Sequence, residues 1–397
     1  MTNLILDLDS LRASADIVIA GSLTSTGASF EIGDLAIERV TFNSSQLNYI
    51  AEQGQLHVGV PQSGETITLT IDYSFGIQDD FNGLLQGGST FTWPYYCGNI
   101  FPCKSEPAEG SSYSLMLEGV PEGAVSLYAD SLALDVPAYM LGWSVGSYHY
   151  LALGKTSAGT EVGVYYLAGE EQDAISGSQY LRQVFDWYEQ TFGEYGFGHK
   201  VASVSVDWGA AAFGGIEHHP YWHIANGSMS DPVIHAHEAA HGWFGNGVRI
   251  DCWEDFVLSE GMATYLAARA LEAVAGMERG DVVWASYQSQ LDSLQSSGEN
   301  KIAWPQGCNQ IDIIEDGLFG TAPYMKGAFF FKHLESILGA DLLDRLLRDF
   351  YSTQRGNAVT LQQLLTFIED GSGYDPTQCA QAWLRSEALP QGGSCSY

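Results

Sequence analysis

The segment HEAAH at residues 237–241 decides how the rest of this sequence is interpreted. It lies in a pattern typical of a helix, which the Gly-Asn-Gly sequence at 245–247 ends. Because residues four apart lie on one face of a helix, His237 and His241 can each give a ring nitrogen to one Zn²⁺ ion. Glu238 projects from beside them, where its carboxylate can take a proton from a zinc-bound water. The segment therefore predicts a zinc site with an adjacent general base.

A second predicted helix, from about Asp255 to Val274, provides the third ligand. Its residue Glu260 follows His241 after eighteen intervening residues, and a helix–loop–helix hairpin of that length can return a carboxylate to the metal. Two histidines, one glutamate and an open position form the arrangement of catalytic rather than structural zinc sites. We therefore predict one zinc ion per chain, held by His237, His241 and Glu260.

Three other polar residues near the predicted site have competing interpretations. His235 lies two residues before His237 and points elsewhere on the helix, so we expect a surface histidine of the first turn and no metal ligand. Asp255 and Asn246 either hydrogen-bond to the ligating histidines or serve as a helix cap and a C-terminal turn. Both alternatives stay open from the sequence alone.

The composition excludes several classes of function. Among 397 residues, 48 acidic side chains outnumber 16 basic ones, for a formal charge of −32. Nucleic acids and anionic membranes need clustered lysine and arginine, so neither is an expected partner. No apolar run reaches the roughly 18 residues of a membrane-spanning helix, so we expect no membrane insertion. Self-repulsion at this charge opposes association, and we expect a monomer.

The six cysteines bear on the compartment. An even number keeps open three disulfides in an oxidising compartment, and six buried thiols are the alternative. The pairs suggested by proximity, with the remainder as a third pair, are Cys97–Cys103, Cys379–Cys395 and Cys252–Cys308. The sequence does not fix this pairing. The first ten residues have no signal-peptide pattern, so we expect either a secreted or periplasmic bacterial protein whose signal sequence is absent, or a cytoplasmic one.

The pattern of apolar residues changes near Gly169. Before it, short stretches of strand type are separated by Gly, Ser, Asn and Pro, and the alternation at 66–71 is typical of a half-buried strand. After it, helical patterns dominate, apart from a short strand predicted at 200–207. We therefore predict an α+β protein with an N-terminal β domain at 1–168 and a mostly helical domain at 169–397.

Residues 237–265, HEAAHGWFGNGVRIDCWEDFVLSEGMATY, resemble the core of the aminopeptidase N-type zinc aminopeptidases. These gluzincins have WFGN after the first motif and a NEG-FATY segment after the eighteen-residue spacer, where this chain has Ser259 in place of the Asn. The segment NIFPCKSEP at 99–107 is similar to the family's FPCFDEPA. The resemblance implies a saddle-like β-sheet domain followed by a thermolysin-like zinc catalytic domain. Larger members continue with further domains, so we expect a short two-domain member.

The resemblance also implies roles for two residues outside the zinc motif. GGIEH at 214–218 stands where the family has its GxMEN motif, whose glutamate grips the free α-ammonium of the substrate, so Glu217 takes that role. His218 replaces the family's Asn. PYMKG at 323–327 resembles the family's YEKG, whose tyrosine donates its hydroxyl to the oxyanion of the tetrahedral intermediate, so Tyr324 takes that role.

Three further residues are candidates for substrate binding in the light of the same resemblance. Gly214 and Gly215 would let the substrate backbone approach an edge strand closely, since glycine has no side chain. Trp93 would either line the pocket for the first substrate side chain or belong to the core of the β domain. The family's second amine anchor, upstream of FPC, has no carboxylate or amide counterpart at 91–96.

These assignments imply a zinc-dependent aminopeptidase that hydrolyses the N-terminal residue from peptides with a free N-terminus, with Glu238 as general base and Tyr324 as oxyanion donor. A thermolysin-like endopeptidase is the first alternative, because it shares the zinc chemistry and does not need Glu217. A non-catalytic scaffold on the same fold is the second, although it predicts the loss of a ligand, the base or the tyrosine. Epoxide opening, found in one branch of the family, is an activity that no residue here demands.

Overall fold

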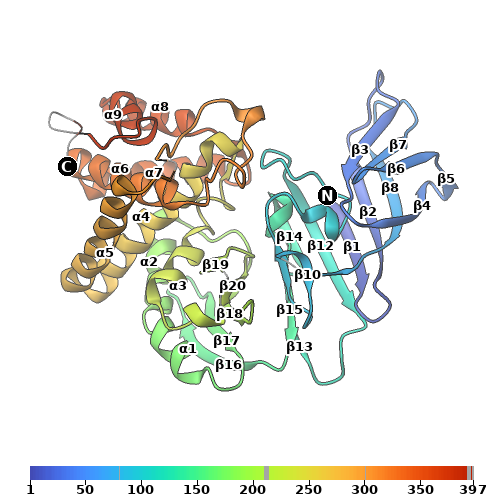
Figure 1. The fold of residues 1–397 in the computed structure, drawn as a ribbon, viewed down its shortest axis with the longest axis horizontal. Helices are drawn as coiled ribbons and strands as arrows, with labels where there is room; N and C mark the ends of the chain where they lie inside the picture. The colour runs from blue at the N-terminus through green and yellow to red at the C-terminus, as the bar shows by residue number, and fades with distance from the viewer. Residues whose placement is uncertain (80, 210–213, 300, 391–394, 396–397) are drawn as a thin grey trace. The chain divides into compact units, whose positions relative to one another are not determined.

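The computed structural model describes residues 1–79, 81–209, 214–299, 301–390 and 395. It forms two compact units, of which the first comprises Met1–His149 with His218–Tyr221 and the second the remaining residues (Figure 1). The first unit is rich in strands and the second in helices, which confirms the predicted α+β class with its N-terminal β region. Every residue predicted for the site lies within the described ranges.

A seven-stranded sheet is the largest element of the first unit. Its strands, in spatial order, are β14 (Ser131–Val136), β12 (Ser111–Glu118), β1 (Thr2–Asp7), β2 (Arg12–Ile19), β8 (Ile67–Ser74), β4 (Ala36–Phe42) and β5 (Ser45–Gln46). Only β1 and β12 pair in parallel among the described ladders of this sheet. Strand β8 alternates buried with more exposed residues, so the half-buried strand predicted at 66–71 is confirmed.

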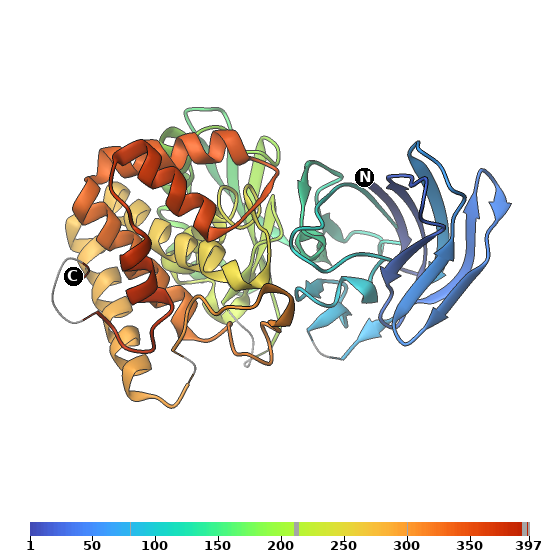
Figure 2. The same cartoon turned by 90° about the horizontal axis from the view of Figure 1, so that it is seen from above.

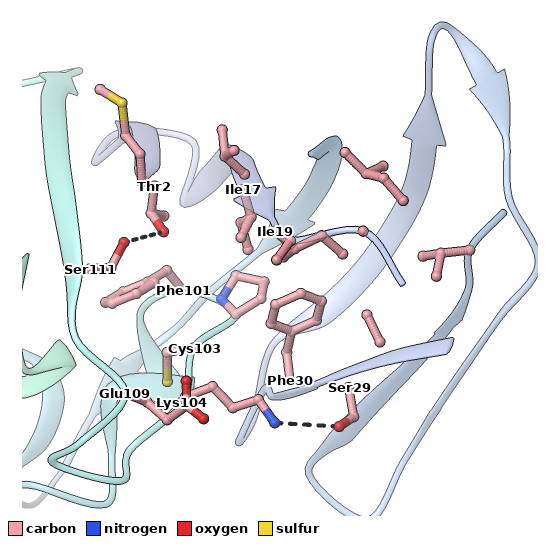
Figure 3. Close-up of a pocket in the computed structure, with 18 of the residues that line it drawn as sticks. Thr2, Ile17, Ile19, Ser29, Phe30, Phe101, Cys103, Lys104, Glu109 and Ser111 are labelled. Atoms are coloured by element: carbon pink, nitrogen blue, oxygen red, sulfur yellow. Dashed lines mark hydrogen bonds between the residues drawn. The ribbon is translucent and has the colours of Figure 1, made fainter. Parts of the chain in front are cut away.

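Among its described residues, the first unit also contains three smaller sheets. They are β3 (Gly27–Glu31), β7 (Gln55–Gly59) and β6 (Tyr49–Glu52); β11 (Thr90–Thr92), β10 (Asn82–Leu85) and β9 (Ile77–Gln78); and β13 (Val125–Leu127) with β15 (Ser144–Gly146). A cavity of about 500 Å³ is lined in part by β2, β3 and the segment after Phe101 (Figure 3). Its apolar lining includes Ile17 and Phe30, and the exposed Lys104 donates to the hydroxyl of Ser29 at 3.4 Å. The residues that line it include none of those predicted for the metal site.

The second unit contains a five-stranded sheet. Its strands, in spatial order, are β16 (His149–Lys155), β17 (Glu161–Tyr166), β18 (Lys200–Val206), β20 (Tyr221–Ala225) and β19 (Gly215–Ile216). Strands β17 and β18 run in parallel, and the two-residue β19 is an edge strand antiparallel to β20. Contacts group β17 with the second unit, whereas the sequence placed it before a domain boundary at residue 168. That boundary stays a prediction.

Helices make up most of the second unit (Figure 2). They are α1 (Glu171–Ser178), α2 (Leu181–Phe192), α3 (Pro232–Ala240), α4 (Phe256–Ala275), α5 (Met277–Ser296), α6 (Thr321–Leu338), α7 (Ala340–Gln354), α8 (Leu361–Ser372) and α9 (Thr377–Leu384). The buried helix α4 packs against α3, α5 and α6. A short parallel pair, β21 (Arg249–Ile250) with β22 (Ala358–Val359), links the segment after α3 to the segment after α7.

All six cysteines are paired in the structure. The bonds are Cys97–Cys103, Cys252–Cys308 and Cys379–Cys395. This confirms the prediction of three disulfides and settles the pairing that the sequence left open. Among the described residues, no helix combines the length and the apolar character needed to cross a membrane.

Candidate active site

Two histidine nitrogens and one carboxylate oxygen meet at the C-terminal end of α3. His237 lies in the last turn of this helix and His241 follows it as the C-cap, so that their Nε2 atoms lie 3.2 Å apart. Helix α4 brings Oε2 of Glu260 to 3.0 Å from Nε2 of His237 and 3.6 Å from Nε2 of His241. Donor atoms of a tetrahedral zinc ion with bonds of 2.0–2.1 Å are separated by about 3.3 Å. The three predicted ligands therefore fit a single zinc ion.

The ring of His241 is oriented by the turn that follows α3. Its Nδ1 lies 3.1 Å from the carbonyl oxygen of Phe244 and 3.3 Å from the hydroxyl of Ser259. Because a carbonyl group only accepts, Nδ1 bears the hydrogen and Nε2 keeps its lone pair for a metal. Gly245, at φ 112°, must be glycine, since a Cβ there would lie 2.5 Å from both Nδ1 of His241 and the hydroxyl oxygen of Ser259.

His237 is oriented by α4 in a similar way. The hydroxyl of Thr264 donates its hydrogen to the carbonyl oxygen of Glu260 at 2.7 Å. Because the hydrogen of this hydroxyl is used, its oxygen can only accept a hydrogen bond from Nδ1 of His237, which lies 3.4 Å away. Nδ1 of His237 therefore bears the hydrogen, and both histidines present Nε2 as the metal-binding atom. The sequence analysis did not identify Thr264 or the carbonyl of Phe244, because neither type of group is a metal ligand with a recognisable spacing.

The charge around this cluster favours a cation. Burial alone would lower the pKa of His241, but the carboxylates of Glu260 and Glu217 raise it to about 10. Burial would likewise raise the pKa of Glu260, but His241 and His237 hold it below its ordinary value. Two nitrogens and a carboxylate at about 3 Å, surrounded by further carboxylates, are therefore a donor set that a divalent cation would neutralise.

Glu238 lies beside the ligands in a buried position, 5% exposed. Burial raises its pKa well above the ordinary value, and the carboxylates of Glu217 and Glu260 raise it further, while His241 opposes them. Its carboxylate fills the space in front of Gly215, where a Cβ would lie 2.6 Å from Oε1. Gly215 is thus needed to admit Glu238, and its predicted role in binding substrate backbone stays a prediction, as does that of Gly214.

Glu217 follows directly after the edge strand β19. One of its carboxylate oxygens lies within 4.8 Å of a carboxylate oxygen of Glu238 and a ring nitrogen of His241. The side chain is 8% exposed. The structure thus brings the predicted amine anchor to the predicted base, although the two are 21 residues apart in the sequence.

Tyr324 lies in the first turn of α6. Its ring stacks on that of His237, with centroids 6.1 Å apart and planes at 25°, and forms a T-shaped pair with Phe256. Burial raises the pKa of its hydroxyl well above the ordinary value, and the carboxylates of Glu260, Glu217 and Glu238 raise it further. The hydroxyl therefore stays protonated and can act as a hydrogen-bond donor.

Lys326, two residues further on, is fully buried. Its ammonium group donates to the carbonyl oxygens of Ser386 at 2.5 Å and Glu387 at 3.2 Å. Burial lowers its pKa to about 8, with Glu387 opposing the shift. Lys326 thus ties the beginning of α6 to the segment that follows α9.

The loop before α6 is fastened to the turn before α4. The disulfide Cys252–Cys308 joins them, and a carboxylate oxygen of Glu254 accepts from the backbone nitrogen of Gly307 at 3.0 Å. The other oxygen of Glu254 pairs with Arg385 at 2.7 Å. The helices that contain Glu260 and Tyr324 are therefore connected at their N-terminal ends as well as along their lengths.

The contacts of His235 differ from those expected from the sequence. His235 is no surface residue: it is 1% exposed, and its ring lies 2.8 Å from the hydroxyl of Ser203 and 2.9 Å from the carbonyl of Met229. Among the described residues, the clusters of possible metal-binding atoms do not include it, and its predicted absence from the metal site stays a prediction. The prediction of a surface position was wrong because α3 packs on β18, which the helix pattern alone does not reveal.

Asp255 and Asn246 contact neither ligating ring through their side chains in the hydrogen bonds described. Asp255 accepts from the backbone nitrogen of Leu361 at 2.9 Å and so holds the start of α8. The backbone of Asn246 donates to the carbonyl of His241 at 3.1 Å, which makes it part of the C-terminal turn of α3. Trp93 belongs to the first unit, where it stacks on Phe91, and its role in substrate binding stays a prediction.

Residues 225–383 match the Peptidase family M1 domain. The chain is 23% identical to Aminopeptidase N of Lactococcus lactis, over 98% of this chain and 51% of that protein, and 22% identical to Leucine aminopeptidase 2-1 of Meyerozyma guilliermondii, over 74% and 50%. A crystal structure of an M1 zinc metallopeptidase from Deinococcus radiodurans has the same fold, with a TM-score of 0.82 at 17% identity, over 98% of this chain and 94% of that one.

These comparisons agree with the geometry of the site. The domain match and the aminopeptidase relatives support the assignment of this chain to peptidase family M1, of the aminopeptidase N type. It spans about half the length of the curated relatives it matches.

Proposed function

We propose that this protein is a zinc-dependent aminopeptidase that removes the N-terminal residue from peptides with a free N-terminus. The observation that supports this most directly is the cluster of Glu217, Glu238 and His241, whose polar atoms lie within 4.8 Å of one another beside the metal-binding set. A base and an amine-binding carboxylate at one metal centre are what an exopeptidase needs. The relatives support the proposal, since they are described as aminopeptidases.

The metal ion would be held by His237, His241 and Glu260, one ion for each chain. A zinc ion bound there supplies Lewis acidity, which activates water and polarises a carbonyl group. The hydrogen bonds of the two Nδ1 atoms orient the rings and leave each Nε2 available to bind the ion.

Glu238 is the proposed general base. Its carboxylate takes a proton from the water that attacks the first peptide carbonyl, and then delivers that proton to the amine that leaves. The raised pKa of this buried carboxyl suits the first step, because burial makes the carboxylate a stronger base than an exposed one.

Tyr324 and Glu217 would act on the two ends of the reacting residue. The protonated hydroxyl of Tyr324 donates to the oxygen that becomes negative as the carbonyl is attacked. The carboxylate of Glu217 pairs with the α-ammonium group, so the first peptide bond is placed beside Glu238. A solved structure of a mutant of the Deinococcus radiodurans enzyme is described as bound to the substrate Tyr-Ser-Ala, a peptide short enough for such a site.

We further propose a monomeric protein in an oxidising compartment, either secreted or periplasmic. Three disulfides support the compartment, because such bonds persist where thiols are not kept reduced. The formal charge of −32 supports the monomer, because it opposes self-association.

The proposal is tested with a panel of aminoacyl p-nitroanilides and the same compounds with acetylated amines, each with and without a chelator. We expect cleavage of the free-amine compounds only, and loss of this cleavage with the chelator. Cleavage of acetylated compounds would favour an endopeptidase and remove the role of Glu217. No cleavage of either set by a zinc-loaded protein would contradict an enzymatic function on these substrates.

A further inference from the structure

The side chain of Asn246 lies in the turn that follows α3 and reaches the residue that binds the substrate amine in the proposed function. Its Nδ2 donates to the backbone carbonyl oxygen of Glu217 at 2.7 Å, and Asn246 has no exposed surface. A buried carbonyl group that loses such a donor is left without a hydrogen bond away from water, which is unfavourable, so this contact stabilises the position of the Glu217 backbone.

The same turn also determines the position of a metal ligand. Its Phe244 carbonyl accepts from Nδ1 of His241, and the backbone of Asn246 donates to the carbonyl of His241. The backbone of the turn is closely packed, because a Cβ on Gly247 would lie 2.3 Å from the carbonyl oxygen of Gly242. One short segment therefore contacts both the metal ligand and the amine anchor.

The residue after Glu217 is fixed as well. The ring of His218 is fully buried, with Nδ1 3.2 Å from the carbonyl oxygen of Met140. A Cβ on Gly142 would lie 2.6 Å from the same ring. Glu217 is thus followed directly by a residue with buried contacts of its own.

We propose that Asn246 is a positioning residue that sets the distance from the carboxylate of Glu217 to the metal ligands, and through it the cleavage of one residue at a time. This inference rests on the proposed function, in which Glu217 binds the ammonium group. In the hydrogen bonds described, the side chain of Asn246 contacts the backbone of Glu217 and none of the three proposed metal ligands. Its effect reaches the substrate only through the backbone of Glu217, so it should alter recognition of the amine and leave the metal bound.

The experiment measures binding without turnover. The zinc-loaded Glu238→Gln protein is titrated by calorimetry with the peptide Tyr-Ser-Ala and with its N-acetyl form, with and without the further change Asn246→Asp. Aspartate has the same shape but cannot donate from that position when ionised. Its negative charge alone would attract an ammonium group, so a loss of amine selectivity cannot be a long-range charge effect. Asn226→Asp is the matched control, because Asn226 uses only its Oδ1 acceptor in the contact described.

We expect Glu238→Gln to bind the free peptide at least tenfold more tightly than the acetylated one, and Asn246→Asp to reduce that ratio at least tenfold with zinc content unchanged. An unchanged ratio would overturn the inference. Loss of zinc from Asn246→Asp would also overturn it, since the residue would then serve the metal site. If Glu238→Gln itself does not distinguish the two peptides, the proposed amine anchor fails and the inference fails with it. Should Asn246→Asp not fold, Asn246→Ala provides the same comparison.

Discussion

Gly261 of α4 and Gly327 of α6 lie in direct backbone contact. A Cβ on Gly327 would lie 2.5 Å from Cα of Gly261, and a Cβ on Gly261 would lie 2.7 Å from Cα of Gly327. Each glycine follows a residue of the site, since Glu260 directly precedes Gly261 and Tyr324 lies one turn before Gly327. The closeness of these two helices therefore sets the distance between a metal ligand and the predicted oxyanion donor.

The first prediction concerns this contact. Gly327→Ala should push α6 away from α4, because neither backbone can yield, and lower the free energy of unfolding by about 1–3 kcal/mol. It should also lower kcat at least tenfold, since displacing Tyr324 by a fraction of an ångström weakens its hydrogen bond to the transition state. Thermal unfolding and steady-state kinetics measure both effects. Gly227→Ala is the control, because a Cβ on that exposed glycine meets nothing within 4 Å; equal effects of the two changes would contradict the prediction.

The second prediction concerns the base. Glu238→Gln should lower kcat by about 10²–10⁴, the usual contribution of general acid–base catalysis, while zinc content measured by atomic absorption stays at the wild-type level. Glu278→Gln, on the exposed side of α5, removes the same charge far along the chain and should leave kcat unchanged. An active Glu238→Gln enzyme would show that another group moves the proton.

The third prediction separates binding from catalysis at Tyr324. Tyr324→Phe should lower kcat by about 10²–10³ and leave KM nearly unchanged, because the hydroxyl is needed only as negative charge develops on the oxygen. Tyr351→Phe is the matched control: it removes a hydroxyl that donates to the carbonyl of Glu194 at 3.0 Å, away from the site. It should affect the unfolding temperature and not kcat. A rise in KM with unchanged kcat for Tyr324→Phe would instead indicate a substrate-binding role.

The fourth prediction concerns pH and His218. Burial lowers the pKa of its ring to about 4, although the backbone groups of Met140 and Tyr139 oppose the shift. Its unfolded pKa is 6.5, so the unfolded chain takes up the proton first. The stability that depends on the neutral ring is present above pH 6.5 and is lost as the pH falls from 6.5 towards 4. By pH 5 the loss should reach about 2 kcal/mol.

The variant His218→Asn has no such titration. Urea unfolding at pH 7 and pH 5 should therefore show a larger fall in stability for the wild type than for His218→Asn. Groups that titrate in both proteins contribute equally to the two pH dependences, so the difference between the wild type and His218→Asn reports on His218. Parallel pH dependences of the two proteins would mean that His218 does not become charged on unfolding in this range.

The metal-binding set could be predicted from the sequence because its determinants are local. The spacing of His237 and His241 within one turn needs only helix geometry, and Glu260 needs only a hairpin of known length. The alternation of buried and more exposed residues in β8 could be predicted for the same reason, since it reflects a period of two residues along a single strand.

Contacts between distant segments could not be predicted in this way. His235 is buried because its ring fits between Ser203 of β18 and the carbonyl of Met229, and neither partner follows from the helix pattern. Gly215 was recognised as special, but the group that fills its missing side-chain space, the carboxylate of Glu238, belongs to another element. The sequence shows that residue 215 has no side chain, but it does not show which group occupies that space.

The buried ammonium group of Lys326 has a practical consequence for the boundaries of a recombinant fragment. The match to the family domain ends at residue 383, whereas the acceptors of Lys326 are the carbonyl groups of Ser386 and Glu387. A fragment that ends at residue 383 would retain the three proposed metal ligands. It would lack the carbonyl groups that accept from the buried ammonium group of Lys326, two residues from Tyr324. The shortest fragment worth purifying therefore includes Ser386 and Glu387 and extends to Cys395, which forms a disulfide with Cys379.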